Sequence, residues 1–417
     1  MNIIKGLIVV SCIFGMLQQS LAQSGDSYVI LISLDGYRYD YTARFQPKNL
    51  LGMIAEGTAA KSMIPSFPTK TFPNHYSIAT GMKPENHGLI NNAFYDSKKD
   101  QVYSIRNRNI VEDGYWYGGK PLWVLAEEQG LKAASFFFVG SEADVQGVRP
   151  SYYRNYDAAV SNLTRVTQAL TWLELPEEER PRLITLYFSD IDDVGHAYGP
   201  NNDEQLKRRI EKLDHELGVL FEGVKSLDLD VNLFVVSDHG MVDVPKENLI
   251  NLDHLTKDID ARVVNNGALA HLYLNNPLEL EDVFLKLSDS SEPFQVVKVK
   301  DKRYYKNITS YADRLGDLLI LPDFGFYLAT TPDMVKYQQK SGTLRTEVFG
   351  EHGYSPAYKE MHAIFYAAGE NIKEGLSIES FQNIHVYPLI AYLLGLPIPE
   401  GIDGDLKVLK KILKSEE

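Results

Sequence analysis

Three apolar runs in this chain each end at an acidic residue. YVILIS precedes Asp35, LITLYFS precedes Asp190, and LFVVS precedes Asp238. Continuous apolar runs of this length are typical of strands in a parallel sheet, whose two faces are both covered by helices. In open α/β sheets, ligands bind beyond the carboxyl ends of the strands. We therefore expect these acids, which come from distant parts of the chain, to meet at one edge of a parallel sheet.

Expected strands and helices alternate along most of the 417 residues. The expected strands are 28–34, 134–138, 183–188, 232–237 and 362–367, and the expected helices are 48–57, 71–80, 121–129, 163–173 and 205–224. This alternation predicts an α/β fold, with a mostly parallel central sheet flanked by helices. The stretch from about 252 to 349 has short alternating runs instead, and we interpret it as a smaller β-rich insertion or cap.

The charge balance argues against one class of partner. The formal net charge is −14, and no basic cluster stands out along the chain. Binding to nucleic acid through the phosphate backbone depends on clustered Lys and Arg, so no specific nucleic-acid binding is expected. A small anionic substrate would need local positive charge, which bound metal ions can supply within an acidic protein.

The first 22 residues are typical of a secretory signal peptide. Lys5 is followed by an apolar run up to Leu17 and by a Ser20-x-Ala22 ending, so cleavage is expected after Ala22. A membrane anchor is the alternative, but the apolar run is shorter than the roughly 18 residues that a spanning helix needs. The only cysteine, Cys12, lies in this segment. We therefore expect a secreted or periplasmic protein without disulfides and without a transmembrane helix in the mature chain.

The segment DIDDVGHAYGP carries several possible metal ligands. Asp192 and His196 are four residues apart, so one helical turn would bring their Cβ atoms within about 5–6 Å of each other. Mixed Asp and His ligands suit zinc or a similar transition metal, whereas calcium prefers oxygen ligands alone. Asp190 and Asp193 are competing candidates, with capping in a polar loop as their alternative role.

Three further candidate ligand positions are each followed by glycine. These are Asp35–Gly36, Asp238–Gly240 and His352–Gly353. Glycine permits backbone angles that other residues avoid, so it can aim a side chain at the end of a strand into a site. Each segment alone could be a surface turn, but the repeated pattern favours ligands.

Thr71 stands at the expected start of a helix, in PTKTFPNHYSIATG. Threonine is favoured as an N-cap, and on spacing alone a cap is the simpler role. A hydroxyl at a helix N-terminus also faces unpaired N–H groups that suit a phosphate. A metal bound to that hydroxyl would make it a nucleophile. Both roles remain open at this point.

Taken together, the longer motifs resemble one known family. PSFPTKTFPNHYSIATGMKPENHGLINN, DDVGHAYGP, VVSDHGM and EHGY are similar to the nucleotide pyrophosphatase/phosphodiesterase family, or type I phosphodiesterases, of the alkaline phosphatase superfamily. The likeness runs from Tyr28 to the GIDGDL tail near Gly401. It implies an alkaline-phosphatase-like catalytic domain over residues 23–417. It also implies a hydrolase that cleaves nucleotide phosphodiester or pyrophosphate bonds and releases nucleoside 5′-monophosphates.

The resemblance implies two zinc ions as cofactors. One would be held by Asp192, His196 and His352, and the other by Asp35, Thr71, Asp238 and His239. Thr71 would be the nucleophile and would form a phospho-threonine intermediate. Asn92 would donate a hydrogen bond to a phosphoryl oxygen.

Substrate choice depends on aromatic positions. Relatives that cleave nucleotides hold the base between aromatic rings, and Phe72, Phe138 and Tyr153 are the matching residues. Core packing is the alternative for each of them, most of all for Phe138 at the end of an apolar strand. Choline-phosphodiesterase or lysophospholipase-like activity at the same metal site is an alternative function, and a non-catalytic binding ectodomain is another. His75 and His87 match no ligand position of the family.

Overall fold

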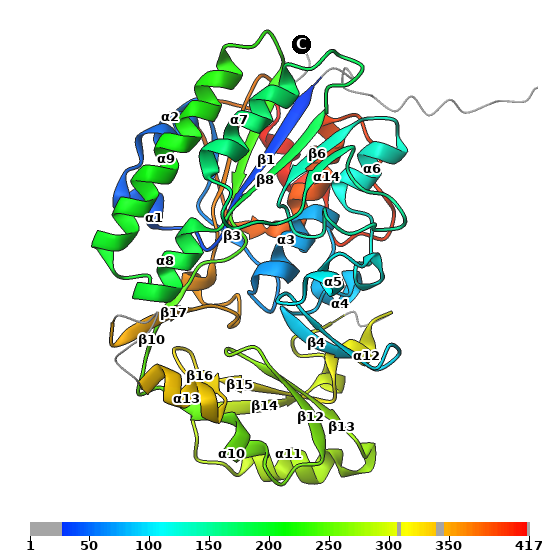
Figure 1. The fold of residues 1–417 in the computed structure, drawn as a ribbon, viewed down its shortest axis with the longest axis vertical. Coiled ribbons are helices and arrows are strands. Elements are labelled where there is room, and N and C mark those ends of the chain that lie inside the picture. Colours follow the sequence, from blue (N-terminus) through cyan, green and yellow to red (C-terminus); the bar gives the residue numbers. More distant parts are fainter. Residues whose placement is uncertain (1–26, 307–309, 339–345, 415–417) are drawn as a thin grey trace, which may run out of the picture.

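A computed structural model describes residues 27–306, 310–338 and 346–414 of the chain. The expected signal peptide lies outside the described residues. Figure 1 shows a larger body, built on a central sheet, and a smaller unit below it with a sheet of its own. Among the described residues, no helix is both long and apolar enough to span a membrane.

The central sheet has eight strands in the order β19-β2-β18-β9-β1-β8-β6-β7. In this order their bounds are Leu376–Ile378, Gly57–Ala60, Phe365–Ala368, Val231–Val236, Tyr28–Leu34, Leu183–Phe188, Ala133–Phe136 and Tyr152–Arg154. Strand β1 pairs in parallel with β8 and with β9. Strand β18 is antiparallel to β9 and β2. The predicted mostly parallel sheet is therefore confirmed, with β18 as the strand that runs the other way.

The register brings the ends of three central strands together. Ser33, near the end of β1, lies opposite Tyr187 of β8 and Val236 of β9. The acids that follow these strands therefore leave the same edge of the sheet.

Helices cover both faces of this sheet (Figure 1). One face carries α2 (Lys48–Ala55), α7 (Asn162–Leu173) and α9 (Asp203–Lys225), and the other carries α3 (Thr71–Thr80), α6 (Leu122–Glu128) and α14 (Val386–Leu393). Strand β1 shows why both faces are filled, because its alternate residues belong to different cores. Ile30 and Ile32 pack into the core under α7 and α9, and Val29 and Leu31 pack into the core under α3 and α6.

Shorter elements complete the larger body. They are α1 (Tyr41–Phe45), β3 (Met63–Ile64), α4 (Pro84–His87), β4 (Ala93–Asp96), β5 (Gln101–Ser104), α5 (Arg108–Val111), α8 (Asp190–Tyr198), β10 (Val242–Pro245), β17 (Val348–Glu351), β20 (Phe381–Gln382) and α15 (Leu406–Leu409). Short 3-10 turns lie at Gly114–Trp116, Lys359–Met361, Asn383–His385 and Lys410–Ile412. Two of these elements position the site: α8 follows strand β8, and β17 precedes His352.

The smaller unit has an antiparallel four-stranded sheet in the order β12-β13-β15-β14. These strands are Ala261–Asn265, Ala270–Leu274, Leu318–Pro322 and Phe294–Lys298. Around them lie β11 (Leu249–Asn251), α10 (Leu252–Thr256), α11 (Leu280–Ser288), α12 (Ala312–Leu315), β16 (Tyr327–Ala329), α13 (Thr331–Gln338) and 3-10 turns at Pro277–Glu279 and Val299–Asp301. Leu272, Leu287 and Ile320 belong to a core of its own. The expected smaller β-rich unit is thus present.

A buried arginine joins the two units. The Arg314 guanidinium, only 2% exposed, donates from Nε to Asp96 Oδ2 at 2.8 Å. Its Nη1 donates to the carbonyl oxygens of Gly88 at 2.8 Å and Trp116 at 2.9 Å. A buried charge is tolerated only when it is paired in this way, so Arg314 fixes the smaller unit on the β4 side of the body.

Replacing Arg314 should therefore destabilise the protein. Arg314→Met leaves Asp96 buried without its cation, which typically costs about 3–5 kcal/mol of unfolding free energy. Urea unfolding would measure the loss, with Lys61→Met as the control because the Lys61–Glu379 pair is exposed. An exposed pair contributes roughly 0–1 kcal/mol, so similar losses in the two variants would contradict the role given to Arg314.

Candidate active site

Three carboxylates meet at the carboxyl edge of the central sheet: Asp35 and Asp238 are buried, and Asp192 is partly buried. Asp35 directly follows β1, Asp238 lies two residues beyond β9, and Asp192 lies in the first turn of α8, just after β8. The Asp192 N–H donates to the Asp35 carbonyl at 3.1 Å, and the Gly36 N–H donates to Asp238 Oδ1 at 3.1 Å. Backbone hydrogen bonds therefore hold the three acidic segments directly against one another.

Gly36 is needed for this contact. Its φ is +67°, and a Cβ built on it would lie 2.9 Å from Asp192 Cα. Any other side chain would push α8 away from the end of β1. The glycine after Asp238 acts differently from our expectation, because Gly240 is not among the residues with positive φ. It is required for space, since a Cβ there would lie 2.1 Å from the Glu360 carbonyl oxygen.

Three histidines present the same ring nitrogen to the carboxylates. Nδ1 of each ring lies within hydrogen-bond distance of a backbone carbonyl: His196 at 2.7 Å from Gly350, His239 at 2.9 Å from Gly240, and His352 at 2.8 Å from Thr69. A carbonyl can only accept, so it places the proton on Nδ1 and leaves Nε2 as a free electron-pair donor. This backbone support is typical of metal-binding histidines.

The side chains fall into overlapping groups that could hold metal ions. Their ligand atoms lie within 4.8 Å of one another in three sets: Asp192, His196 and His352; Asp35, Asp192 and His239; and Asp35, Asp238 and His75. The first set is the one that the resemblance implies. Its helical spacing is also as expected, because His196 Nε2 lies 3.3 Å from Asp192 Oδ2 across one turn of α8.

The second implied set is centred on His239. Its Nε2 lies 3.4 Å from Asp35 Oδ1, 3.0 Å from Asp238 Oδ2 and 3.3 Å from Thr71 Oγ. His75 is also close to Asp238, at 3.3 Å. Both ring nitrogens of His75 already have other partners, however, in Ser33 Oγ at 2.8 Å and the Thr71 carbonyl at 2.9 Å. These contacts make His75 a support for Asp238 and leave His239 as the freer donor.

One oxygen of each carboxylate is buried without a hydrogen-bond partner among the described residues. These atoms are Asp35 Oδ1, Asp192 Oδ1 and Asp238 Oδ2. Burial raises the pKa of the Asp35 carboxyl well above its usual range, and the charges of Asp238 and Asp192 raise it further. Buried, crowded and unpaired anions of this kind are compensated by bound cations. The donors present therefore fit divalent metal ions.

Tyr187 orients one of these carboxylates. Its hydroxyl, at the end of β8, donates to Asp35 Oδ2 at 2.6 Å, so that Oδ1 faces His239. The sequence analysis did not select this tyrosine, because LITLYF reads simply as a buried strand. Tyr187 lies one residue from the end of its strand and pairs with Ser33, and this position could have identified it as a residue of the site.

Thr71 is not the cap of its helix. The N-cap of α3 is Lys70, and Thr71 is the first helical residue, so the capping role is wrong. Its hydroxyl points instead towards His239. The next N–H, of Phe72, donates to Asn92 Oδ1 at 3.0 Å, which fixes the carbonyl end of that side chain and leaves its amide nitrogen as a donor.

Two candidates from the α8 segment have structural roles. Asp190 is paired with Arg209 at 2.9 Å and accepts from Asn162 Nδ2 at 2.8 Å. Asp193 accepts from Ser189 Oγ at 3.1 Å. Neither belongs to a group that could hold a metal among the described residues, so the alternative role holds for both.

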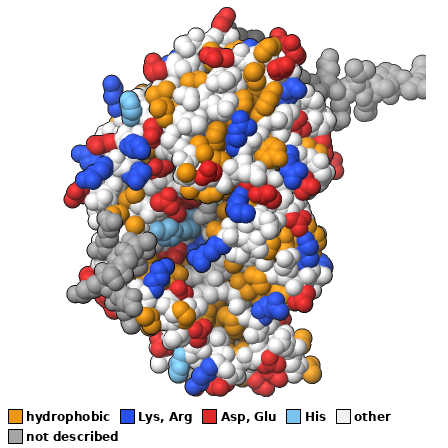
Figure 2. Space-filling model, viewed as in Figure 1, with side chains coloured by type: hydrophobic (Ala, Val, Ile, Leu, Met, Phe, Trp, Pro, Cys, Tyr) orange, Lys and Arg blue, Asp and Glu red, His pale blue; other side chains and the backbone are white. Residues whose placement is uncertain are grey.

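A cavity of about 450 Å³ opens beside Thr71. Its wall includes Asp35, Asp192 and the aromatic rings of Phe72, Phe137, Tyr156 and Tyr187, with Arg106, Arg108 and Glu142 also lining it. Figure 2 shows histidine side chains at the surface at mid-height, where the two units meet, with acidic and basic side chains around them. A planar apolar group could lie in this cavity while its anionic end reaches Thr71.

Of the three aromatic residues expected to hold a base, Phe72 lines this cavity, whereas Phe138 and Tyr153 are not among its lining residues. The chain turns at Phe137, where φ is +72°, and Phe138 is sent into the core against His75 and Trp123. Tyr153 lies on β7 beside Arg149. The tyrosine at the cavity is Tyr156, three residues later in SYYRNYD. Phe138 is therefore packed in the core, and Tyr156 lines the cavity where Tyr153 does not.

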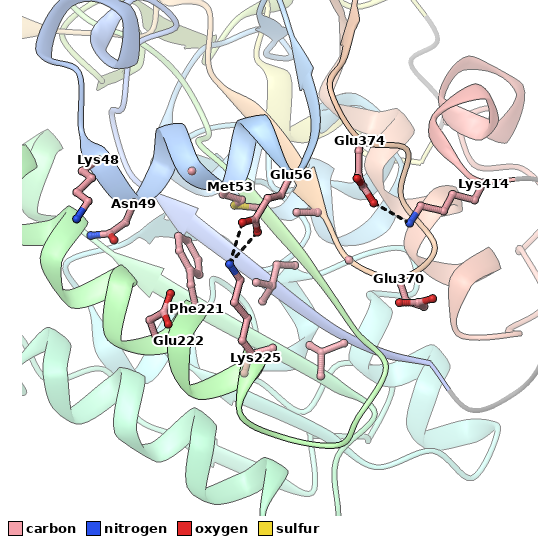
Figure 3. Close-up of a pocket in the computed structure, with 16 residues that line it drawn as sticks. Lys48, Asn49, Met53, Glu56, Phe221, Glu222, Lys225, Glu370, Glu374 and Lys414 are labelled. Atoms are coloured by element: carbon pink, nitrogen blue, oxygen red, sulfur yellow. Dashed lines mark hydrogen bonds and ion pairs between the residues drawn. The ribbon is translucent and has the colours of Figure 1, made fainter.

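A second cavity, of about 540 Å³, lies at the opposite end of the central sheet. Its apolar floor includes Met53 and Phe221, and Figure 3 shows two ion pairs across its rim, Glu56–Lys225 and Glu374–Lys414. These two ion pairs neutralise four of the charges at the rim, and none of the grouped Asp and His ligands lines the cavity. The chemistry of the molecule is therefore concentrated at the carboxyl edge.

Comparison with known proteins identifies the family of the chain. Residues 29–355 match the family model described as type I phosphodiesterase / nucleotide pyrophosphatase. The chain is 36% identical over 400 residues to ectonucleotide pyrophosphatase/phosphodiesterase family member 1 of Homo sapiens. This alignment covers 92% of this chain and 42% of the relative. The chain is 35% identical over 396 residues to venom phosphodiesterase CdcPDE of Crotalus durissus collilineatus, covering 92% and 46%. The chain spans less than half the length of these curated relatives.

Solved structures of related proteins share the fold. Murine ectonucleotide pyrophosphatase/phosphodiesterase 5 superposes with a TM-score of 0.83 at 26% identity, over 93% of this chain and 100% of that one. The same protein has been solved as an inactive threonine-to-alanine variant in complex with AMP, with the same TM-score of 0.83 and the same coverage. The chain therefore belongs to the type I phosphodiesterase / nucleotide pyrophosphatase family.

Proposed function

We propose that this protein is a secreted two-zinc hydrolase. It cleaves nucleotide phosphodiester or pyrophosphate bonds and releases nucleoside 5′-monophosphates through a phospho-threonine intermediate on Thr71. Residues 23–417 form the catalytic domain after removal of the signal peptide. The names of the relatives, which are ecto- and venom enzymes, support export.

One observation carries this proposal. The Thr71 hydroxyl lies 3.3 Å from His239 Nε2, at the N-terminus of a ten-residue helix and beside the aromatic cavity. A nucleophile, two groups of metal donors and a wall for a planar base therefore meet at one point. The AMP complex of the murine relative supports a nucleoside monophosphate as the ligand of this cavity.

In this proposal two sets of donors would hold the two zinc ions. Asp192, His196 and His352 would hold one, and Asp35, Thr71, Asp238 and His239 would hold the other. Bound zinc would supply the positive charge that lowers the pKa of the Thr71 hydroxyl and offsets the charge of the phosphate. This answers how a chain with a formal charge of −14 binds an anion.

The chain's own groups then set the geometry of the reaction. Thr71 Oγ attacks phosphorus in line with the leaving group, the bond from phosphorus to that group breaks, and the nucleoside monophosphoryl group is transferred to Thr71 as a phospho-threonine diester that still carries the nucleoside. The amide nitrogen of Asn92 donates to a phosphoryl oxygen as charge develops there. Water then hydrolyses the phospho-threonine, which restores the hydroxyl and releases the nucleoside monophosphate.

Replacing the nucleophile should abolish turnover. Thr71→Ala is expected to lower kcat for the p-nitrophenyl ester of a nucleoside 5′-monophosphate by at least about 1,000-fold, because no other hydroxyl replaces it. Removal of zinc with a chelator should have a comparable effect, and added zinc should restore the wild type but not the variant.

The matched control for this variant is Thr80→Ala. Thr80 is buried in the same helix, and its hydroxyl donates to the Tyr76 carbonyl rather than facing the site. Its loss should leave kcat within about two-fold. Retained activity in Thr71→Ala, with zinc bound, would contradict the proposed mechanism.

The aromatic cavity predicts how substrate selectivity can be changed. Tyr156→Leu removes one ring available for stacking, which is worth about 1–3 kcal/mol per base and should raise KM for the nucleotide ester about 10-fold. The KM for bis(p-nitrophenyl) phosphate, which carries no base, should change little. Tyr153→Leu is the control and should behave as wild type.

The same assay separates the proposal from its alternatives. Faster hydrolysis of p-nitrophenyl phosphorylcholine than of the nucleotide ester would favour a choline phosphodiesterase. No hydrolysis of either ester by the zinc-loaded protein would favour a binding ectodomain. A larger effect of Tyr153→Leu than of Tyr156→Leu would overturn the assignment of the cavity.

A further inference from the structure

A second buried ion pair lies inside the site, next to the nucleophile. Lys70, the residue before Thr71, places its Nζ 2.7 Å from Glu351 Oε1, and the two side chains are only 6% and 7% exposed. Neither residue is among the metal donors given above. Glu351 immediately precedes His352, so the pair connects the segment of the nucleophile to the segment of a metal ligand.

Several hydrogen bonds run alongside this pair. Glu351 Oε1 also accepts from the His352 N–H at 2.8 Å. Nδ1 of His352 donates to the Thr69 carbonyl at 2.8 Å. Thr69 Oγ accepts from the Gly353 N–H at 2.9 Å and donates to the Tyr354 carbonyl at 3.0 Å. Every residue from Glu351 to Tyr354 is therefore tied to Thr69 or Lys70.

Gly353 makes room for the lysine. Its φ is +113°, and a Cβ built on it would lie 2.4 Å from Lys70 Cε. The glycine after His352 therefore serves two purposes: it turns the chain after the ligand, and it lets the Lys70 stem pass through to Glu351.

The site is already acidic, and the positive charge of Lys70 offsets the negative charge of Glu351 there. Three carboxylates already meet beside His352, and Glu351 without a partner would add a fourth anion near Asp192 and His196. Lys70 neutralises that charge from inside the protein. A buried ion pair is weak evidence for stability, since replacing both partners by apolar residues is often neutral. A contribution to stability therefore does not explain why Lys70 and Glu351 are paired here.

We propose that Lys70 and Glu351 are positioning residues that hold His352 at a fixed distance from Thr71. The donor sets of both metal ions would then act on the same phosphorus atom. This inference rests on the proposed function, because it concerns the same metal site. It assigns no contact with substrate to either residue. The pair acts through His352, whose Nε2 lies 3.7 Å from Asp192 Oδ1.

The test is zinc binding by the double variant Lys70→Met/Glu351→Leu, measured by competition with a chromophoric chelator. Loss of support around a metal ligand typically costs about 10- to 100-fold in affinity, and we expect that loss at one of the two zinc sites. The kcat for the nucleotide ester should fall by a similar factor, while KM for it changes little. Glu351→Gln, which keeps the shape of the side chain, should weaken the same site and serves if the double variant does not fold.

Two controls separate positioning from stability. Arg314→Met/Asp96→Leu removes another buried ion pair, away from the site, and should leave both zinc affinities within about two-fold. In a His352→Ala background, removing the Lys70–Glu351 pair should cause no further loss of zinc affinity at the site of Asp192 and His196, because the ring through which it acts is gone.

Unchanged zinc affinity in both Lys70–Glu351 variants would overturn the inference, as would an equal loss at the two sites. A persistent effect in the His352→Ala background would also overturn it, since the pair would then act by another route. A wild-type protein that binds no zinc and cleaves no ester would instead refute the proposed function itself.

Discussion

The site depends on three carboxylates that meet at one edge of the sheet, two of them fully buried. Parallel pairing of β8, β1 and β9 in one register brings Asp35, Asp192 and Asp238 to the same edge of the sheet. Within the part of the chain that the structure describes, one oxygen of each has no hydrogen-bond partner. Such a cluster is unfavourable unless cations compensate it. The packing of the sheet brings the carboxylates together and so favours bound metal ions. The surrounding residues orient the side chains that could bind them.

The supporting groups are largely backbone. Each of the three histidines has its Nδ1 at a carbonyl from a different segment: β17, the turn after His239, and the loop before α3. The hydrogen bond of Tyr187 turns Asp35 in the same way. The candidate metal ligands are therefore oriented by elements that also build the core, so changes to the fold would also change the site.

Much of this was predictable from sequence. Long apolar strands before Asp35 and Asp238 define a buried parallel sheet, and the four-residue spacing of Asp192 and His196 gives one turn of helix. Strand order was not predictable, because β18 pairs with β9 from more than a hundred residues away and in the opposite direction. Local pattern carries no information about such a partner.

The errors at the site have similar causes. Thr71 resembled a cap because the sequence does not reveal which residue is the first in the helix, and the hydroxyl of the true first residue faces His239. Phe138 and Tyr153 were selected in segments that contain several aromatics; the turn of the backbone at Phe137 sends Phe138 into the core, and Tyr156 rather than Tyr153 lines the cavity. The Lys70–Glu351 pair joins residues 281 positions apart, and no spacing rule connects them.

The most direct test of the metal assignment is anomalous diffraction at the zinc edge from crystals of the protein purified with zinc. Two peaks are predicted, one among Asp192, His196 and His352, and one among Asp35, Asp238, His239 and the Thr71 hydroxyl. A single peak, or a peak held by His75 in place of His239, would contradict the division of the donors into these two sets.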